Sequence, residues 1–293
     1  NLLDSLCSFD VSAARNVYNK HLLSKNINTE LALVHEWLII NKLSLNIKKT
    51  TFMIFHHRQR NIANFIPVIT ISNHTISRVE SFDFLGLTLD QHLNWHPHIQ
   101  KIANKVSRTL GVMNRLKRFV PMHILKMIYN SLVMPHLQYS ILTWGFNTNR
   151  LAKLQKRAAR TITCSKYNAH TDPLFKRLNL LKLNDIFKLC TLKFYYKYEH
   201  NQLPSFFSNM FQNSSHSHYT RHRENFYQGT PKTLSGVKCI RYFLPSLLRD
   251  TPPCIKDKVI THSFHGFTTY CKKHLIDTYS DCCNIPNCYV CSH

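Results

Sequence analysis

Acidic side chains are scarce in this 293-residue chain, and none are placed as the pair that two-metal phosphoryl transfer requires. That chemistry needs at least two carboxylates that can meet around Mg²⁺. No two acidic residues are adjacent, and Glu80 and Asp83 lie three residues apart on an expected strand, so their side chains would point to opposite faces. The chain also contains no Walker A loop, G-x-S-x-G elbow or HExxH motif. The residues alone therefore indicate no complete catalytic site.

The C-terminal residues CCNIPNCYVCSH contain side chains that can bind zinc, namely Cys283, Cys288, Cys291 and His293. Their spacing, C-x₄-C-x₂-C-x-H, includes a single CxxC knuckle, whereas zinc ribbons pair two. We therefore expect this tail to bind Zn²⁺ weakly or not at all. No secretory leader is visible, so we expect the ten cysteines to be reduced thiols of an intracellular protein, in the nucleus or the cytoplasm.

Positive charge dominates the chain, which has 38 Lys and Arg against 15 Asp and Glu. The excess is concentrated between Gln91 and Thr171, where thirteen Lys and Arg residues occur without one acidic residue. Ordinary solvated helices mix signs, because opposite charges four residues apart stabilise a helix and like charges do not. For any single helix a solvated basic face is the simple interpretation. Over 81 residues, however, the pattern favours a polyanionic partner, nucleic acid ahead of a membrane surface.

A membrane partner is disfavoured on two grounds. No apolar run approaches the ~18 residues that a membrane span needs. A helix lying on a membrane surface carries large apolar side chains beside its basic face, and the basic segment LAKLQKRAARTI offers only Leu, Ala and Ile. We therefore expect no membrane association, and the oligomeric state stays open.

Hydrophobic periodicity predicts an α+β fold that is mainly helical. A helix is expected over 28–42 with Asn28 as its N-cap, and either one strand or a strand–turn–strand over 43–55. A hairpin turn is expected at Ser72-Asn73-His74. In FDFLGLTLD (82–90), a glycine within a strand pattern indicates a bulge or a close backbone approach. The expected helices of the remaining chain follow Trp95, open at Pro121, and occupy 149–162 and 183–201.

The helix expected over 149–162 separates its residue types into two faces. The apolar face carries Leu151, Leu154, Ala158 and Ile162, and the other carries Lys153, Lys156, Arg157 and Arg160. Aromatic residues near the basic segment have helical spacing, which is more typical of core residues than of base-stacking platforms; they are Phe119, Tyr129, Tyr139, Trp144 and Tyr167.

Four segments occur in a recognisable order: NKLSLNIKKTTFMIF (41–55), FDFLGLTLDQHLNWHPHI (82–99), MIYNSLVMPHLQYSILTWG (127–145) with LQKRAARTI (154–162), and IRYFLPSLLRDTPPCIKD (240–257). The first resembles the segment after the active-site turn in reverse transcriptases of Jockey-like non-LTR retrotransposons. The second resembles their primer-grip hairpin, the third their thumb and post-thumb helices, and the last the final module of that reading frame. The likeness runs from about Asn28 to nearly the end of the chain.

The resemblance implies an organisation and a partner. Residues 1–95 would be the C-terminal part of the palm with the primer grip, 96–211 the helical thumb and post-thumb region, 212–235 a polar linker, and 236–293 a small module with the Cys-rich tail. Such a thumb holds an RNA template paired with a DNA primer by phosphate contacts, which position the duplex without reading its sequence.

The resemblance also implies roles for individual residues. Phe84, Leu85 and Gly86 would support the primer terminus, and Lys49, in an N-x-x-K-T pattern, would approach the phosphates of the incoming nucleotide. A solvated strand-end lysine and a plain bulge glycine are the alternatives for Lys49 and Gly86. The expected phosphate contacts are Lys101, Lys105, Arg108, Arg115, Lys117, Arg118, Lys153, Lys156, Arg157 and Arg160.

The catalytic centre that the resemblance implies is incomplete. The family's paired aspartates lie in a Y/F-A-D-D turn about forty residues before LSLN, and here that region reads LCSFDVSAA (6–14), with Asp10 as the candidate remnant. We expect Mg²⁺ in the intact parent enzyme, no metal in this chain, and no activity of this chain alone. We therefore expect the chain to be a C-terminal fragment of an RNA-directed DNA polymerase. The alternative is a non-enzymatic nucleic-acid-binding helical protein, a domesticated or decayed remnant.

Overall fold

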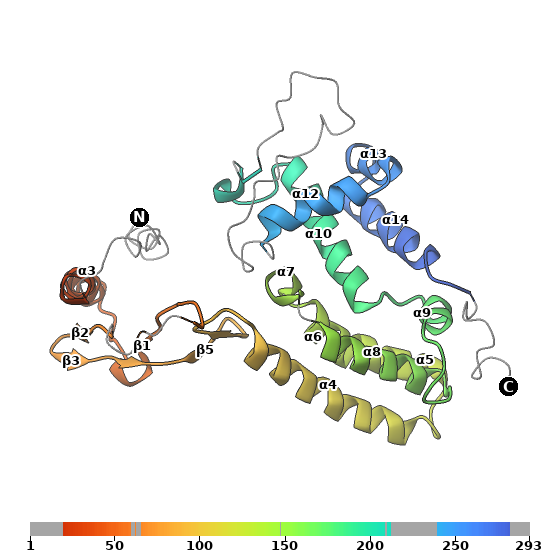
Figure 1. Cartoon of the computed structure of the whole chain (residues 1–293), viewed down its shortest axis with the longest axis horizontal. Helices are drawn as coiled ribbons and strands as arrows, with labels where there is room; N and C mark the ends of the chain where they lie inside the picture. The colour runs from red at the N-terminus through yellow and green to blue at the C-terminus, as the bar shows by residue number, and fades with distance from the viewer. Residues whose placement is uncertain are drawn as a thin grey trace. The chain divides into compact units, whose positions relative to one another are not determined.

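The computed structural model describes residues 20–59, 62, 66–146, 148–208, 210–211 and 239–281. In these ranges the chain is mainly helical with three short strand pairs, which confirms the predicted α+β, mainly helical class (Figure 1). It forms two compact units, Asn1–Asn94 and Trp95–His293. The predicted linker at 212–235 lies outside the described residues.

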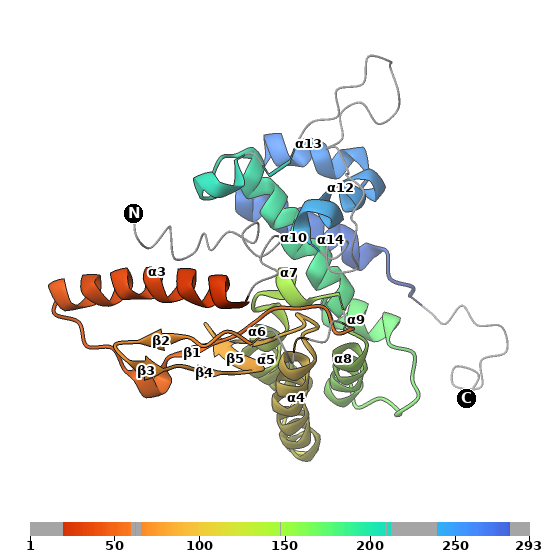
Figure 2. The ribbon, with the colours of Figure 1, turned by 60° about the vertical axis from the view of Figure 1, so that its left-hand side comes forward.

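The first unit packs one helix, α3 (Lys20–Ile40), on short strands. β1 (Thr51–Phe52) pairs in parallel with β4 (Ser77–Arg78), and β2 (Thr70–Ile71) pairs antiparallel with β3 (His74–Thr75). Figure 2 shows α3 running along these strands. The small core consists of Ile69, Ile71 and Ile76, with Ile27, Leu31, Leu45 and Phe52 packed against it.

The β2–β3 connection is the predicted hairpin turn. Ser72 and Asn73 have φ values of 49° and 64°. Positive φ at both central residues gives the turn that best follows the twist of a two-residue hairpin. Asn28, by contrast, is not an N-cap, because α3 begins well before it. Its side chain instead accepts a hydrogen bond from Thr70 N at 3.0 Å and donates one to Val68 O at 3.3 Å, so it fastens the helix to the strand.

The second unit contains all the remaining described α-helices, and α4 (His96–Leu116) is the longest of them. Short helices follow it, and α8 (Asn149–Ile162) has the predicted bounds. The others are α5 (Met122–Leu132), α6 (Met134–Gln138), α7 (Ile141–Trp144), α9 (Asp172–Leu178), α10 (Leu183–Glu199), η2 (Ser205–Phe207), α12 (Ile240–Asp250), α13 (Pro253–Thr261) and α14 (Phe264–Asp277).

The core of the second unit is formed where α4, α5 and α8 meet, and Leu110, Met113, Tyr129, Leu151 and Ile162 are each at most 1% exposed there. One buried polar side chain joins these helices to the α9–α10 connection. Gln155 Nε2 donates to Tyr129 Oη and to Leu181 O, both at 2.9 Å, and its Oε1 accepts from Leu183 N at 2.8 Å. All the polar groups of this amide therefore have partners, as a buried amide requires.

The C-terminal helices pack on α10, which contacts both α12 and α14. After α14, Tyr279 donates to Asp185 Oδ2 at 2.7 Å and accepts from Lys182 N at 3.0 Å. Burial, followed by the hydrogen bond to Asp185, raises the pKa of Tyr279 far above its ordinary value. This contact ties the end of α14 to the start of α10, 94 residues earlier.

Candidate nucleic-acid interface

The predicted primer-grip residues lie at the tip of a hairpin in the first unit. β5 (Ser81–Phe84) pairs with β6 (Leu87–Asp90), and the register places Phe84 opposite Leu87. Leu85 (φ 46°) and Gly86 (φ 82°) form the two-residue turn between them. Gly86 is thus a turn residue, and the prediction of a bulge was wrong. The positive φ values explain the glycine, while a leucine in this conformation is uncommon.

The hairpin tip presents apolar side chains to solvent. Phe84 is 54% exposed and Leu85 is 74% exposed, and every residue of β5 is exposed. Asp90 closes the other end of the hairpin, because its carboxylate accepts hydrogen bonds from His92 N at 3.2 Å and Asn94 N at 3.1 Å. The structure therefore displays an apolar tip on a hairpin whose base is fixed.

Lys49 lies at the end of a short 3-10 turn, η1 (Ile47–Lys49), within the segment predicted as a strand or a strand–turn–strand over 43–55. Asn46 caps this turn, since its Oδ1 accepts from Lys49 N at 3.2 Å. Thr50 Oγ1 donates to Asn46 O at 3.0 Å. The N-x-x-K-T pattern thus has a local structural meaning: Asn46 and Thr50 hold the turn that leaves the Lys49 side chain exposed.

Four cations of α4 form one stripe, the α4 stripe (Lys101, Lys105, Arg108 and Arg115), and all four are exposed. Their spacings of four, three and seven residues place them on a single face of the helix. At 1.5 Å per residue the stripe is about 21 Å long. The opposite face is buried and carries Ile102, Val106, Leu110 and Met113.

α8 carries a second set of cations, the α8 stripe (Lys153, Lys156, Arg157 and Arg160), opposite its buried face. The first three are exposed and Arg160 is half-buried. Arg160 Nε donates to Ala169 O at 2.8 Å, and burial lowers the pKa of this guanidinium. Arg160 therefore also anchors the connection that follows α8.

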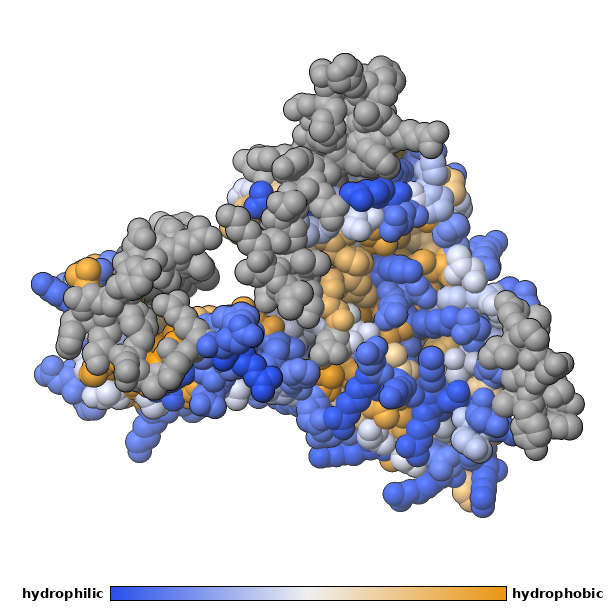
Figure 3. Space-filling view, in the orientation of Figure 1, coloured by the Kyte–Doolittle hydropathy of each residue, from blue (hydrophilic) through white to orange (hydrophobic). Residues whose placement is uncertain are grey.

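The two helices run side by side in the same direction. Arg150 Nη1 donates to Gln100 Oε1 near their starts, and Cys164 Sγ lies 3.9 Å from Lys117 O beyond their ends. Figure 1 shows the pair, and Figure 3 shows hydrophilic side chains over much of the same face of the molecule. Lys117 and Arg118 follow the α4 stripe at this end, Lys117 half-buried and Arg118 exposed. The predicted phosphate contacts of the second unit thus belong to two adjacent helices and their ends.

Six cations of these stripes have no carboxylate partner within the described parts of the chain. The cations Lys105, Arg108, Arg115, Lys153, Lys156 and Arg157 make no ion pair with a described residue. Their effect reaches a neighbouring helix, since burial and then the charge of Lys105 lower the pKa of His136 on α6. The ion pairs lie elsewhere, as in Lys176–Asp281 at 2.7 Å and Lys182–Asp172 at 2.6 Å.

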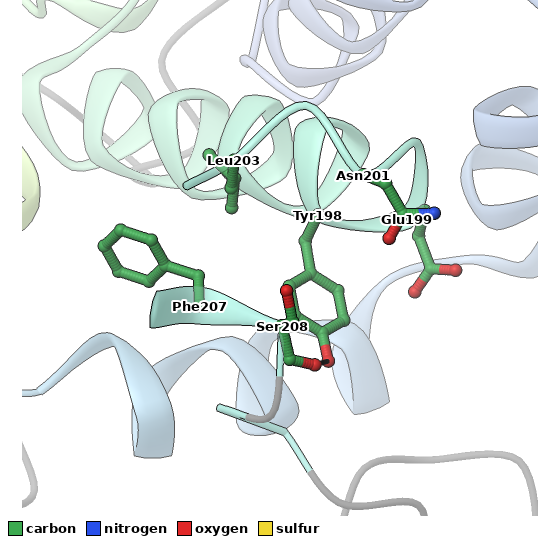
Figure 4. Close-up of a pocket in the computed structure, with 6 residues that line it drawn as sticks. All are labelled: Tyr198, Glu199, Asn201, Leu203, Phe207 and Ser208. Carbon is green, nitrogen blue, oxygen red and sulfur yellow. Dashed lines mark hydrogen bonds between the residues drawn. The ribbon is translucent and has the colours of Figure 1, made fainter. Parts of the chain in front are cut away.

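A pocket in the second unit lies apart from these residues. It is lined by Tyr198, Glu199, Asn201, Leu203, Phe207 and Ser208, and Tyr198 Oη donates to Ser208 O at 3.1 Å (Figure 4). Glu199 is the one carboxylate in the lining, and burial raises its pKa. The pocket contains no predicted site residue, and its lining has no cation.

The sequence was compared with known proteins. No protein-family model matches the chain, and no solved structure gives a significant match. Among curated proteins, a probable RNA-directed DNA polymerase from transposon BS of Drosophila melanogaster is 26% identical over 166 residues, which is 54% of this chain and 18% of that protein. The RNA-directed DNA polymerases from the mobile element jockey of Drosophila funebris and Drosophila melanogaster are 24% and 23% identical over 51% of this chain and 17% of their own lengths. The chain is related to the polymerases of Jockey-like mobile elements.

This relation confirms the resemblance that the ordered motifs predicted. The chain spans less than a fifth of the length of the curated Jockey-like polymerases that it matches. Asp10 and the predicted zinc ligands Cys283, Cys288, Cys291 and His293 lie outside the described residues. Within the described ranges, no group of three or more His, Cys, Asp or Glu side chains could hold a metal ion, and no helix is long and apolar enough to cross a membrane.

Sequence reasoning missed several residues that hold the predicted site residues in place. Arg150 lies within the acid-free segment but was not assigned a role, and it bridges the two helices through Gln100. The signal for Asn46 was present, because Asn is a favoured N-cap and stands three residues before Lys49. The anchoring role of Arg160 had no sequence signal, because its partner is a backbone carbonyl nine residues away.

Proposed function

We propose that this chain is the primer-gripping and thumb part of an RNA-directed DNA polymerase, and that α4 and α8 hold a template–primer duplex by its phosphates. The observation that carries the proposal is the pair of exposed cation stripes on adjacent helices, within a segment that has no acidic residue. Repulsion between like charges on a helix is unfavourable. A phosphate backbone provides the anions that the segment lacks.

The length of the α4 stripe fits this partner. One strand of duplex carries a phosphate about every 3.4 Å along the axis, so a stripe about 21 Å long spans about six of them. Such contacts fix position and carry no sequence information, which is what a polymerase that must copy any template requires.

The first unit supplies the proposed contacts at the primer terminus and the nucleotide. The apolar tip at Phe84 and Leu85 supports the sugar and base of the primer end, and Lys49 meets the phosphates of the incoming nucleotide. The exposure of all three side chains supports these roles. Mg²⁺ belongs to the intact parent enzyme, held by the aspartate pair that this chain lacks, so we propose no catalytic residue here.

A salt titration tests the duplex contacts. Binding of the chain to an RNA–DNA hybrid should weaken steeply with salt, with a log–log slope of about −0.9 per phosphate contact, the value for B-form duplex. Replacing Lys105, Arg108 and Arg115 with Ala, or Lys153, Lys156 and Arg157 with Ala, should flatten the slope by about one unit for each cation that no longer meets a phosphate. Arg160 is left unchanged because it anchors the connection after α8.

The matched control removes the same charge elsewhere in the second unit, by replacing the exposed Arg177, Arg241 and Lys273 with Ala. This triple variant should keep the slope of the unmodified chain. A slope near zero for the unmodified chain, or equal flattening by the control, would show that the stripes are ordinary solvated surface.

The non-enzymatic alternative shares the same basic surface and is favoured by the absence of adjacent aspartates. Variants of the β5–β6 hairpin distinguish the polymerase part from the non-enzymatic nucleic-acid-binding protein. In a polymerase part, Phe84→Ala with Leu85→Ala should weaken binding to a recessed primer end more than binding to a continuous duplex. A general nucleic-acid-binding protein would show no such difference.

A further inference from the structure

Three aromatic side chains among the described residues of the second unit are almost fully exposed, and two of them, Phe119 and Tyr167, lie in the acid-free segment. Phe119, between α4 and α5, is 83% exposed, and Tyr167, between α8 and α9, is 88% exposed. The aromatic residues near the basic segment were expected to be core residues. Tyr129 and Trp144 are buried, but the expectation was wrong for Phe119, for Tyr167 and for Tyr139, which is 52% exposed. A large aromatic ring left in water forgoes the burial that usually accounts for its presence, so the two rings call for an explanation.

The two rings belong to neighbouring connections at one end of the α4–α8 pair. The contact of 3.9 Å between Cys164 Sγ and Lys117 O joins these connections. Phe119 follows Lys117 by two residues and Tyr167 follows Cys164 by three. Figure 1 shows both connections leaving the same end of the two helices.

Each connection is held by hydrogen bonds. Ala169 N donates to Lys166 O at 3.1 Å, which places Tyr167 at a central position of the turn. Arg160 fastens this turn to α8 through Ala169 O. On the other connection, Phe119 N donates to Leu116 O at 2.8 Å. The rings are therefore presented on fixed turns, which reduces the entropy lost on binding.

The rings are surrounded in sequence by cations and by no acid. Lys117 and Arg118 precede Phe119, and Lys166 precedes Tyr167, all within the acid-free segment. Exposed aromatic rings combined with positive charge are the features of sites for single-stranded nucleic acid, where bases stack on the rings and phosphates meet the cations. Duplex contacts need no such rings.

We propose that this connector end (Lys117, Arg118, Phe119, Lys166 and Tyr167) binds unpaired nucleotides of a strand that extends beyond the duplex. The inference rests on the proposed function, because the α4 stripe leads to this end and would guide the duplex toward it. Phe119 and Tyr167 stack on bases, and the three cations contact the phosphates between them.

The test compares a blunt RNA–DNA hybrid with the same hybrid carrying a six-nucleotide single-stranded extension, at one salt concentration. The full chain should bind the extended hybrid more tightly. Phe119→Ala with Tyr167→Ala should remove this preference. The Kd for the extended hybrid should rise about fivefold or more for each base that no longer stacks, while the Kd for the blunt hybrid should change by less than about twofold. Phe119→Tyr with Tyr167→Phe keeps both rings and should keep the preference.

Two controls separate stacking from other effects. Phe206 is 82% exposed on η2, away from this end, so Phe206→Ala should leave the preference unchanged. An extension of abasic nucleotides keeps the phosphates and removes the bases. The hybrid with the abasic extension should bind the unmodified chain with the same low affinity that the hybrid with the natural extension shows for the double alanine variant. The double alanine variant should bind the hybrids with abasic and natural extensions equally.

The outcomes distinguish this inference from the proposed function. Equal affinity of the unmodified chain for blunt and extended hybrids overturns the inference, while the salt slopes of the helix variants still decide the duplex contacts. Equal loss on both hybrids in the double alanine variant also overturns it, since the rings would then belong to the duplex site. If the salt slope is near zero but single-stranded oligonucleotides still bind through both rings, the proposed function fails and stacking at this end stands. RNA and DNA extensions tested in parallel identify which strand is bound.

Discussion

Gln155 joins helices of the second unit through a buried side-chain amide. Its amide lies 2% exposed among α5, α8 and the α9–α10 connection and makes three hydrogen bonds, to Tyr129, Leu181 and Leu183. Burial, which the bond from Gln155 partly offsets, raises the pKa of Tyr129 to about 12. The core at this point therefore contains an uncharged Tyr129 phenol and a fully hydrogen-bonded Gln155 amide in place of purely apolar side chains.

Replacing Gln155 with Ala should lower the free energy of unfolding by about 2–4 kcal/mol, because it leaves buried backbone and phenol groups without partners and opens a small cavity. Urea denaturation measures this. Lys156→Ala, one residue further and exposed, should stay within about 0.5 kcal/mol of the unmodified chain. A loss of the same size in both variants would mean that the helix, and not the amide network, is responsible.

His136 reports the positive field of the α4 stripe. Its pKa is lowered by burial first and by the charge of Lys105 second. Lys105→Ala should therefore raise the pKa of His136 part of the way toward its ordinary value, as followed by an NMR titration of the ring. Lys153→Ala is the control on the other helix and should leave the pKa unchanged.

The sign of the pH dependence follows from the lowered pKa. The unfolded chain holds the His136 proton more tightly than the folded chain, so His136 stabilises the fold least at low pH. Its contribution should be lost as the pH falls below about 6.5. A pKa that rises fully to the ordinary value in Lys105→Ala would show that burial contributes nothing.

Which residues are buried and which are exposed could be predicted from the sequence where local helical periodicity decides it. The cation faces of α8 and the burial of Leu151, Ala158 and Ile162 follow from helical periodicity. That Gln155 would be buried while Leu154 is only half-buried could not be predicted. The partners of Gln155 lie 26 and 28 residues away, and no pattern within α8 indicates them.

The turn of the β5–β6 hairpin contains a residue that has both a strained backbone conformation and an exposed apolar side chain. Its turn places Leu85, a γ-branched apolar residue, at a positive φ of 46°, and leaves it exposed. Such conformations cost about 1 kcal/mol or more and are retained at functional sites. The turn chemistry favours Asn at this position before Gly86.

Leu85→Asn should stabilise the hairpin by about 1 kcal/mol, seen as slower amide exchange in β5 and β6. Gly86→Ala should have the opposite effect, because alanine is strained at a φ of 82°. If Leu85 supports the primer end, Leu85→Asn should also weaken binding to a recessed primer while the hairpin becomes more stable. Stabilisation with unchanged primer binding would argue that the exposed leucine has no such role.

At the scale of elements, the helices of the second unit were predicted best, and the start of α3 and the short strands worst. The bounds of α8 match, whereas α3 begins before the predicted residue 28. The segment predicted as a strand or a strand–turn–strand at 43–55 contains the turn η1 and only a two-residue strand. A long helix shows several turns of one periodic pattern. Strands of two residues carry too few residues to show alternation, and their pairing depends on partners elsewhere in the chain.

At the scale of the whole chain, the scarcity of carboxylates leads us to expect no polymerase activity. The isolated chain should show no template-directed DNA synthesis with Mg²⁺ or Mn²⁺, because no adjacent aspartate pair is present to hold two metal ions. Incorporation of a labelled deoxynucleotide on a primed RNA template is the measurement. The contrary result would be incorporation that disappears in Asp10→Asn.

The acid-free segment also has a consequence for the protein without its partner. Cations that attract phosphates repel one another when no phosphate is bound, and this self-repulsion opposes the compact state. Salt should therefore have opposite effects on nucleic-acid affinity and on thermal stability. It should weaken the proposed binding to nucleic acid, and it should raise the Tm of the free chain by screening the repulsion between the cations. An inert polyanion should raise the Tm as well, by binding the folded state. Under the proposed function, nucleic acid would be the counter-ion of the folded second unit as well as its ligand, and a thermal scan from low to high ionic strength measures this contribution. A Tm that stays constant or falls would mean that the stripes are too far apart to repel.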